Sequence, residues 1–481
     1  MPEIATSDEQ GDGVTEWGPD GERATAAAPI PRARGLRAHP ELSVRLGAII
    51  VALGLLLAVL EQHHANHDLI AVGLAAAALG RGIGLRRPVL AVHIAAAVGL
   101  LVVARVAADL GHESIELASI VLAGVVALWA PPPPNPGTAG ERRQVWTLVN
   151  TTAQDCIAPF ALRNDKSYVF SPDGMAAVAY RVRFGVAVAS GDPVGAAESQ
   201  PAAAESFIRM VEASGWRLGV LGTGEDWAQW WRGHGLRGVP IGRDVVIDVN
   251  RFDLTGRAFR NLRQAVSRSR NAGVTTEIYP ADAVPSYVES ELKAIVAASH
   301  RNPNRGFAMI LDGLLEDSPH PGTLIAVAFD KDRRPVAFHR FSTADNGREI
   351  SQDLPWRRQG APNGVDERLA HDVVIWAKEH GGQRVSLSFA AFPELYESAP
   401  QTRLTRLAYW GSHRLDGFIR LESLYRYLRK FHALGKRRFV MLRLREIVPV
   451  AAAMLTFEFA TRRRSAHRSN LWRPADGGRR R

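Results

Sequence analysis

Cysteine and lysine are scarce in this chain of 481 residues. The single cysteine, Cys156, excludes an internal disulfide framework and any metal site built on a Cys-x-x-Cys pair. No grouping of a histidine and an acid marks it as a nucleophile. Because there are only six lysines, arginine supplies nearly all of the positive charge, and the formal net charge is +10. This charge suits contact with anionic lipid or nucleic acid, although a GC-rich genome also produces an arginine-rich composition.

Several familiar signals are also missing. The first 30 residues contain no apolar segment of the kind that a secretory signal peptide needs, and their polar, acidic composition predicts disorder. The chain has no GxxxxGK[ST] or GxGxxG phosphate loop, no HExxH and no GxSxG. We therefore expect no cofactor and no metal. Any chemistry must depend on positioning of substrates and on electrostatics.

Long apolar runs are present only near the N-terminus. Four stretches follow a basic segment, and they cover residues 46–60, 69–80, 88–110 and 115–130. A membrane span needs about 20 apolar residues, which the third stretch reaches alone and the others reach with their flanks. We predict an α-helical membrane bundle over 43–131, in which Arg105 pairs with Asp109 one turn later. Because the connections 61–68 and 111–114 contain no Lys or Arg, both termini are predicted to be cytoplasmic.

The composition divides the remaining chain into further regions. Residues 1–42 are predicted to be disordered, and a Pro/Gly-rich linker over 132–144 follows the membrane region. From 145 to 445 helical stretches alternate with short apolar strands, which predicts an α/β domain. The last region, 446–481, begins with the apolar run IVPVAAAMLTF and ends in a basic tail. That run is either a closing helix or an interfacial one, and the tail could lie on anionic lipid.

The segment 351–392 concentrates charges of both signs between a strand and a helix. Asp353, Arg357 and Arg358 precede a Pro-Asn-Gly turn, and Asp366 and Glu367 follow it. Charges in a cleft can bind a substrate that itself carries both signs. A solvated loop with surface ion pairs would show the same pattern. The residues alone leave these two alternatives open.

Four segments resemble one protein family in order along the chain. They are FSPDGMAAVAYRVRFGVAVASGDPVG (170–195), RNLRQAVSRSRNAGV (260–274), APNGVDERL with WAKEHGGQRVSLSFAAF (361–392), and ESLYRYLRKF (422–431). They resemble the C-terminal domain of the phosphatidylglycerol lysyltransferases, also called aminoacyl-phosphatidylglycerol synthases. The resemblance implies a tandem GNAT-like (acetyltransferase-like) fold. It also implies transfer of an aminoacyl group, with lysyl as the expected one, from aminoacyl-tRNA to a lipid hydroxyl, usually of the anionic phosphatidylglycerol. The product would reduce the negative surface charge and give resistance to cationic antimicrobial peptides.

The resemblance also suggests roles for individual side chains. Asp366 or Glu367 would receive the ammonium group of the substrate or assist proton removal, and Lys430 would stabilise developing negative charge. Arginines in the central segment would hold the lipid phosphate. The predicted catalytic residues are Asp366, Glu367, Lys430 and Arg358. The predicted substrate-binding residues are Asp353, Arg357, Asn363, Gly364, Asp192 and Tyr425.

A basic helix over 257–270 is the expected contact for tRNA phosphates. Arg260, Arg263 and Arg270 share one broad face of it by helical spacing. A solvated basic face is the alternative. Four tryptophans could stack on bases or belong to the core: Trp216, Trp227, Trp230 and Trp231.

The chain also departs from the family pattern. Relatives usually carry a much larger membrane region that includes a lipid flippase, and four short spans could serve only as an anchor. The Trp and Pro that commonly follow the late segment are missing here, and Val365-Asp366-Glu367 replaces Met-Asp-Phe. The amino acid and the acceptor lipid therefore stay open. Two further functions remain as alternatives: a CoA-dependent acyltransferase of the same fold and a non-catalytic membrane protein that binds lipid or a partner.

Overall fold

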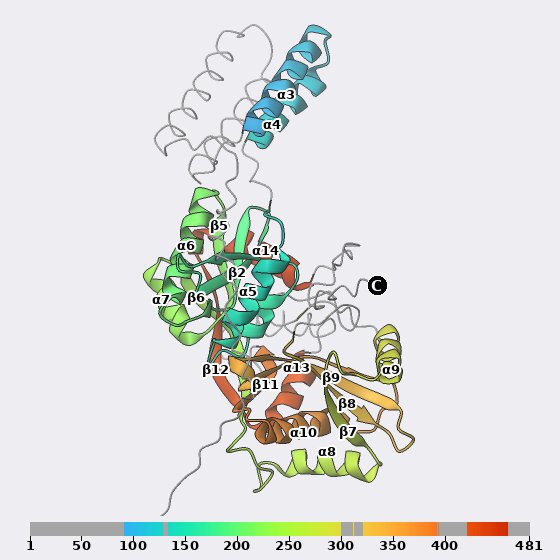
Figure 1. The fold of residues 1–481 in the computed structure, drawn as a ribbon. Coiled ribbons are helices and arrows are strands. Elements are labelled where there is room, and N and C mark those ends of the chain that lie inside the picture. Colours follow the sequence, from blue (N-terminus) through green and yellow to red (C-terminus); the bar gives the residue numbers. More distant parts are fainter. Residues whose placement is uncertain are drawn as a thin grey trace, which may run out of the picture.

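The computed structural model describes residues 91–127, 133–299, 311, 321–391, 393 and 421–459 (Figure 1). Helices α3 (Ala91–Asp109) and α4 (Glu113–Ala127) pack along each other, and they cover parts of the third and fourth apolar stretches. The first two stretches lie outside the described residues. Arg105 pairs with Asp109 at 3.2 Å, as predicted. No helix within the described ranges combines the length and the apolar character that a membrane crossing requires.

The rest of the described chain is an α/β structure built on one 12-stranded sheet. The strands are β1 (Ser167–Phe170), β2 (Ala176–Arg183), β3 (Val186–Ser190), β4 (Val194–Gly195), β5 (Arg217–Thr223), β6 (Arg237–Asp248), β7 (Thr275–Pro280), β8 (Thr323–Phe329), β9 (Pro335–Ala344), β10 (Glu349–Arg357), β11 (Arg384–Ala391) and β12 (Leu434–Leu442). Their order in the sheet is β1-β2-β3-β5-β12-β6-β11-β10-β9-β8-β7, and β4 pairs with β2. The predicted α/β class is therefore correct.

Helices cover this sheet in two groups, which Figure 1 shows one above the other. The helices are α5 (Ala139–Asn150), α6 (Gln200–Ala213), α7 (Glu225–Gly233), α8 (Arg260–Asn271), α9 (Ser286–Ala297), α10 (Val365–Glu379), α13 (Leu421–Leu428) and α14 (Ile447–Phe459). We call β1–β5 with α6 and α7 the first unit. We call β7–β11 with α8–α10 and α13 the second unit.

The two units repeat one topology. In the first, β1, β2 and β3 are antiparallel neighbours, and α6 connects β3 to the parallel strand β5. In the second, β8, β9 and β10 are antiparallel neighbours, and α10 connects β10 to the parallel strand β11. Each unit then adds a helix, α7 or α13, and a last strand. These last strands are exchanged, because β12 pairs with β5 of the first unit and β6 pairs with β11 of the second.

Apolar side chains form a separate core in each unit. In the first unit, α6 and α7 bury Phe207 and Trp231 against alternate residues of the sheet. In the second unit, Leu369 and Val373 of α10 pack with Leu262 of α8 against β9–β11. The spacing of i, i+4 on α10 gives the helix one buried face. Its polar N-terminal turn is consequently directed to the edge of this core.

A glycine fixes the start of α10. Gly364 caps the helix with φ of 89°, and a Cβ there would lie 2.1 Å from the backbone oxygen of Ala265 on α8. Both the left-handed conformation and the close approach require glycine. The first turn of α10 is therefore held directly against α8, and this contact forms one wall of a cleft.

Candidate active site

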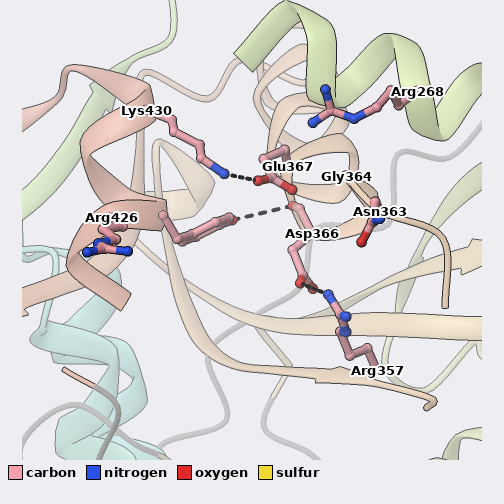
Figure 2. A pocket seen from close by; sticks show the side chains of 9 residues that line it. Arg268, Arg357, Asn363, Gly364, Asp366, Glu367, Arg426 and Lys430 are labelled. Atoms are coloured by element: carbon pink, nitrogen blue, oxygen red, sulfur yellow. Dashed lines mark hydrogen bonds and ion pairs between the residues drawn. The ribbon is translucent and has the colours of Figure 1, made fainter. Parts of the chain in front are cut away.

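The cleft lies in the second unit, where the N-terminus of α10 meets α8 and α13. It has a volume of about 460 Å³. Its lining residues are Arg268, Arg357, Asn363, Gly364, Asp366, Glu367, Arg426, Tyr427 and Lys430. Figure 2 shows acids from α10 between basic side chains from β10, α8 and the segment after α13. Six of the ten residues predicted for catalysis or substrate binding meet here: Arg357, Asn363, Gly364, Asp366, Glu367 and Lys430.

Asp366 is held by partners on both of its carboxylate oxygens. Its Oδ1 lies 3.1 Å from His339 Nε2, and its Oδ2 accepts a hydrogen bond of 3.3 Å from Arg357 (Figure 2 shows the arginine). His339 is fully buried on β9, and Gln352 Nε2 donates to its Nδ1 at 3.2 Å. With Nδ1 accepting, Nε2 carries the proton and donates to Asp366. The orientation of the carboxylate is thus set by side chains behind the cleft.

The same partners determine the charge of Asp366. Burial by itself would raise its pKa, but the hydrogen bonds from His339 and Arg357 and the positive charge of Arg357 outweigh burial and bring the pKa below the usual value. The first turn of a helix also favours a negative charge. Asp366 is therefore an anion at neutral pH in a site that is otherwise rich in cations.

Glu367 forms the second acidic group of the cleft. Its Oε1 accepts a hydrogen bond of 2.6 Å from Lys430 Nζ, as Figure 2 shows. Tyr427 donates to the backbone oxygen of Asp366 at 3.3 Å, and burial together with the two acids raises the pKa of its hydroxyl well above 10. Tyr427 thus stays neutral and links α13 to α10. The pairing of Glu367 with Lys430 joins two segments that are far apart in the sequence.

The charges of this cleft suit a substrate with both an ammonium group and an anionic group. Four cationic side chains surround the two carboxylates: Arg268, Arg357, Arg426 and Lys430. Guanidinium groups bind phosphate or carboxylate through paired N–H donors. Within the described ranges, no group of three or more His, Cys, Asp or Glu side chains could hold a metal ion. The side chains of the cleft can therefore bind a substrate, orient it and transfer a proton.

Four of the predicted site residues do not line the cleft. Arg358 pairs with Glu291 of α9 at 2.6 Å on the exposed surface. Asp353 is buried and accepts from Arg340 Nε at 2.6 Å, so it orients an arginine that does not line the cleft. Tyr425 is 4% exposed in the core of the second unit.

Asp192, the fourth of these, belongs to a buried cluster in the first unit. Arg438 of β12 pairs there with Asp155 at 2.7 Å, Asp192 at 3.3 Å and Asp244 at 2.8 Å. Burial and the neighbouring Asp155 raise the pKa of Asp192 to about 7. The Gly-Asp-Pro turn therefore anchors the exchanged strand β12 and lies outside the cleft.

The arginine of the basic helix α8 that lines the cleft is not one of the three that were predicted to contact tRNA. Arg263 donates to the backbone oxygens of Leu254 and Gly256, which fixes the loop before the helix. Arg260 and Arg270 are exposed and do not line the cleft. Arg268 does line it. The phosphate-binding role of α8 stays a prediction, and Arg268 is the member of the helix nearest to the proposed chemistry.

The four tryptophans pack together in the first unit. Trp231 is fully buried, and Trp216, Trp227 and Trp230 are partly buried against the same core. The ring centroids of Trp230 and Trp231 lie 4.8 Å apart in an edge-on arrangement. This packing corresponds to the core alternative.

Four residues of the site were missed: Arg268, Arg426, Tyr427 and His339. Arg268 belongs to the predicted basic helix but not to the face chosen on it, and the sequence held a signal for Arg426 and Tyr427. Arg426 and Tyr427 lie four and three residues before Lys430, which places them on its side of a helical turn, while Tyr425 lies on the other side. His339 had no such signal, because it meets Asp366 only through pairing of β9 with β10 and packing of α10.

Fold and site together define an α/β protein of two units that repeat one topology, with a charged cleft at the start of the helix after the fourth strand of the second unit. The model of the family "Phosphatidylglycerol lysyltransferase, C-terminal" matches residues 146–442. The chain belongs to this family of aminoacyltransferases, as the four sequence segments indicated.

Similar proteins agree with this assignment. The "MprF-like domain protein Rv1619" of Mycobacterium tuberculosis is 46% identical over 398 residues, and the match covers 81% of each chain. The "Lysylphosphatidylglycerol biosynthesis bifunctional protein LysX" of Mycolicibacterium vanbaalenii is 32% identical over 327 residues, which is 65% of this chain and 29% of that protein. The chain thus corresponds to less than a third of LysX.

Solved structures show the same fold. The C-terminal domain of a putative lysylphosphatidylglycerol synthetase from Agrobacterium fabrum superposes with a TM-score of 0.57 at 21% identity, covering 68% of this chain and 99% of that domain. L-PGS from Bacillus licheniformis gives a TM-score of 0.56 at 19% identity, with the same two coverages.

Proposed function

We propose that this protein transfers an aminoacyl group, lysyl in the first instance, from aminoacyl-tRNA to a hydroxyl of phosphatidylglycerol. The observation that carries the proposal is the ionised Asp366, held between His339 and Arg357 in a cleft that four cationic side chains line. A carboxylate there can bind the ammonium group of an aminoacyl ester. The surrounding cations can bind the phosphates of tRNA and of the lipid.

The reaction needs only modest help from the protein, because an aminoacyl ester is already activated. The lipid hydroxyl oxygen forms a bond to the ester carbonyl carbon, and the bond from that carbon to the tRNA ribose oxygen breaks. In our assignment Glu367 accepts the hydroxyl proton and passes it to the leaving ribose oxygen. Lys430 stabilises the oxyanion formed between the two steps. Asp366 orients the donor through its ammonium group, and Arg357 binds the lipid phosphate.

The location of the protein follows from the same proposal. The apolar stretches before residue 131 would embed the chain in the cytoplasmic membrane, with the α/β structure on the cytoplasmic side. Aminoacylated lipid would place an amine on the membrane surface, and cationic antimicrobial peptides would then bind less strongly.

A CoA-dependent acyltransferase is the competing function. It requires an anion-binding helix terminus for the pyrophosphate. Here two acids, Asp366 and Glu367, occupy the first turn of α10 and would repel that group. The geometry therefore favours the aminoacyl donor.

Lipid mass spectrometry of cells with and without the protein tests this function. A new aminoacylated lipid identifies the amino acid and the acceptor together. Asp366→Asn should abolish the product, whereas Arg358→Gln should retain it, since Arg358 lies outside the cleft. An unchanged lipid profile under strong expression, with the protein present in the membrane fraction, would contradict the proposal.

A further inference from the structure

Helix α14 presents an apolar face that no described part of the molecule covers. Val448, Ala452 and Leu455 are exposed and follow the i, i+4, i+7 spacing of one helix face. The exposed fractions of Val448 and Leu455 are 76% and 54%. Leu444 and Ile447, just before this stripe, are 64% and 46% exposed. A helix that is apolar on its outer side marks an interaction surface.

The opposite face of α14 anchors the helix firmly. Val450, Ala453, Met454 and Phe457 form a buried cluster with residues of β3, β5 and β12. Gly219 of β5 admits this approach, because a Cβ there would lie 2.8 Å from Val450 Cγ1. The outer face is thus displayed on a rigid base in the first unit.

Arginines surround this face. Arg181 of β2 pairs with Val188 in the sheet, and Arg183 pairs with Val186. Paired residues point to the same side of a sheet. Both valines contact α14, so both arginines lie on its side as well.

The contacts of these arginines confirm that placement. The guanidinium of Arg181 lies 4.6 Å from the ring centroid of Phe457 and pairs with the buried Asp165 at 2.6 Å, so the basic border depends mainly on Arg183 and Arg445. At the other end of the helix, Arg445 is exposed and Arg443 pairs with Glu212 at 3.5 Å. At the β2–β3 turn, Phe184 is 63% exposed with Arg183 over its ring.

We infer that the outer face of α14 docks on the surface of a bilayer that contains anionic phospholipid. An apolar ridge with a basic border matches the acyl and headgroup layers of such a bilayer. The sequence continues soon after α14 with Arg462, Arg463 and Arg464, which adds further positive charge to this part of the chain. This inference is independent of the proposed chemistry, because α14 contributes nothing to the cleft.

The test uses the full chain in proteoliposomes, labelled at one new cysteine. Val448→Cys carries an environment-sensitive fluorophore, and Cys156 stays unlabelled because it is buried and its thiol pKa is raised by burial. Ile375→Cys on α10 is the matched control, since Ile375 is also an exposed aliphatic residue, 39% exposed, but lies in the second unit. Quenching by lipids with nitroxide on the acyl chain reports contact with the bilayer.

We expect the probe at 448, and not the probe at 375, to be blue-shifted and quenched severalfold in vesicles of phosphatidylglycerol and phosphatidylcholine. The quenching should weaken in phosphatidylcholine alone, at high salt, and with Arg183→Glu combined with Arg445→Glu. Absence of quenching would overturn the inference, as would equal quenching with and without phosphatidylglycerol. A blue shift without quenching by the nitroxide lipids, or one that grows with protein concentration, would also overturn it and assign the face to another part of the chain or to a second copy.

Discussion

His339 Nε2 donates a hydrogen bond of 3.1 Å to Asp366 Oδ1, and it does so from a side chain that solvent does not reach. The buried imidazole therefore fixes both the direction and the ionisation of a carboxylate that faces the cleft. The same ring accepts a hydrogen bond from Gln352, which fixes its tautomer. Asp366 would otherwise be free to turn toward Arg357 alone.

The first prediction concerns this hydrogen bond. His339→Leu should lower kcat for aminoacyl transfer by about 10- to 100-fold, the usual effect of removing a group that orients a functional one. His339→Gln should recover much of this loss, because its amide nitrogen can replace Nε2. The pH profile decides the mechanism: without the donor, the acidic limb should move to higher pH, since only Arg357 then lowers the pKa of Asp366. Equal losses in Leu and Gln variants, with an unchanged pH profile, would show a merely structural role.

The second prediction concerns Lys430. Lys430→Met should reduce transfer by about 10²- to 10³-fold, the range for loss of one oxyanion donor. The double variant Glu367→Lys with Lys430→Glu should restore the ion pair and the melting temperature, yet leave transfer low. Recovery of activity in the charge-reversed protein would mean that the pair acts only as a structural contact between α10 and the segment after α13.

The third prediction separates two arginines of α8. Arg268→Gln should raise KM for charged tRNA several-fold and reduce the salt dependence of binding, because one phosphate contact is lost. Arg263→Gln should instead lower the melting temperature, since this side chain holds the carbonyls of Leu254 and Gly256. Filter binding of tRNA and thermal unfolding of both variants provide the comparison. A higher KM from Arg263→Gln with unchanged stability would reverse the assignment.

The fourth prediction concerns pH and Asp192. Its pKa is about 7 in the folded protein and 3.8 for an aspartate without these neighbours, so the folded state retains a proton that the unfolded state has lost. The contribution of this proton to stability is complete below about pH 4 and disappears as the pH rises through about 7. Asp192→Asn imitates the protonated form, so its melting temperature should improve relative to the natural protein as the pH rises from about 5 to about 8.

A surface variant provides the control for Asp192. Asp226→Asn removes an exposed acid, 88% exposed, that pairs with Lys436 at 3.3 Å. Its melting temperature should follow that of the natural protein across the same pH range. A relative loss for Asp192→Asn at higher pH would show that the ionised carboxylate stabilises Arg438, which is the opposite of the expected direction.

The sequence was sufficient to predict the α/β class, the family and six members of the cleft. Asp366, Glu367 and their neighbours were accessible because they lie within a few residues of a strand-to-helix junction, where polar residues line clefts. The buried position of Asp353 could not be predicted from the sequence. The alternation of residues along β10 does not show that Asp353 forms a buried ion pair with Arg340 of β9. Arg358 directly follows Arg357 in the sequence, but its side chain lies outside the cleft and pairs with Glu291.

The features that the sequence did not predict depend on contacts between residues that are far apart in the chain. The contact of His339 with Asp366, and that of Arg438 with three acids, depend on the register of strands that are distant in the sequence. No local pattern specifies such a register. The exchange of β6 and β12 was hidden for the same reason.

The exchange of these two strands bears on how the protein is made. While the ribosome is still synthesising the residues between β11 and β12, β5 has no neighbour on its inner edge, because that neighbour is β12. The first unit thus leaves the ribosome early but stays incomplete until the chain has grown from Thr223 to beyond Leu434. A premature stop before β12 would expose the edges of β5 and β6, and a cut between β6 and β7 would separate β11 from β6. The sheet can therefore be completed only after both units have been synthesised.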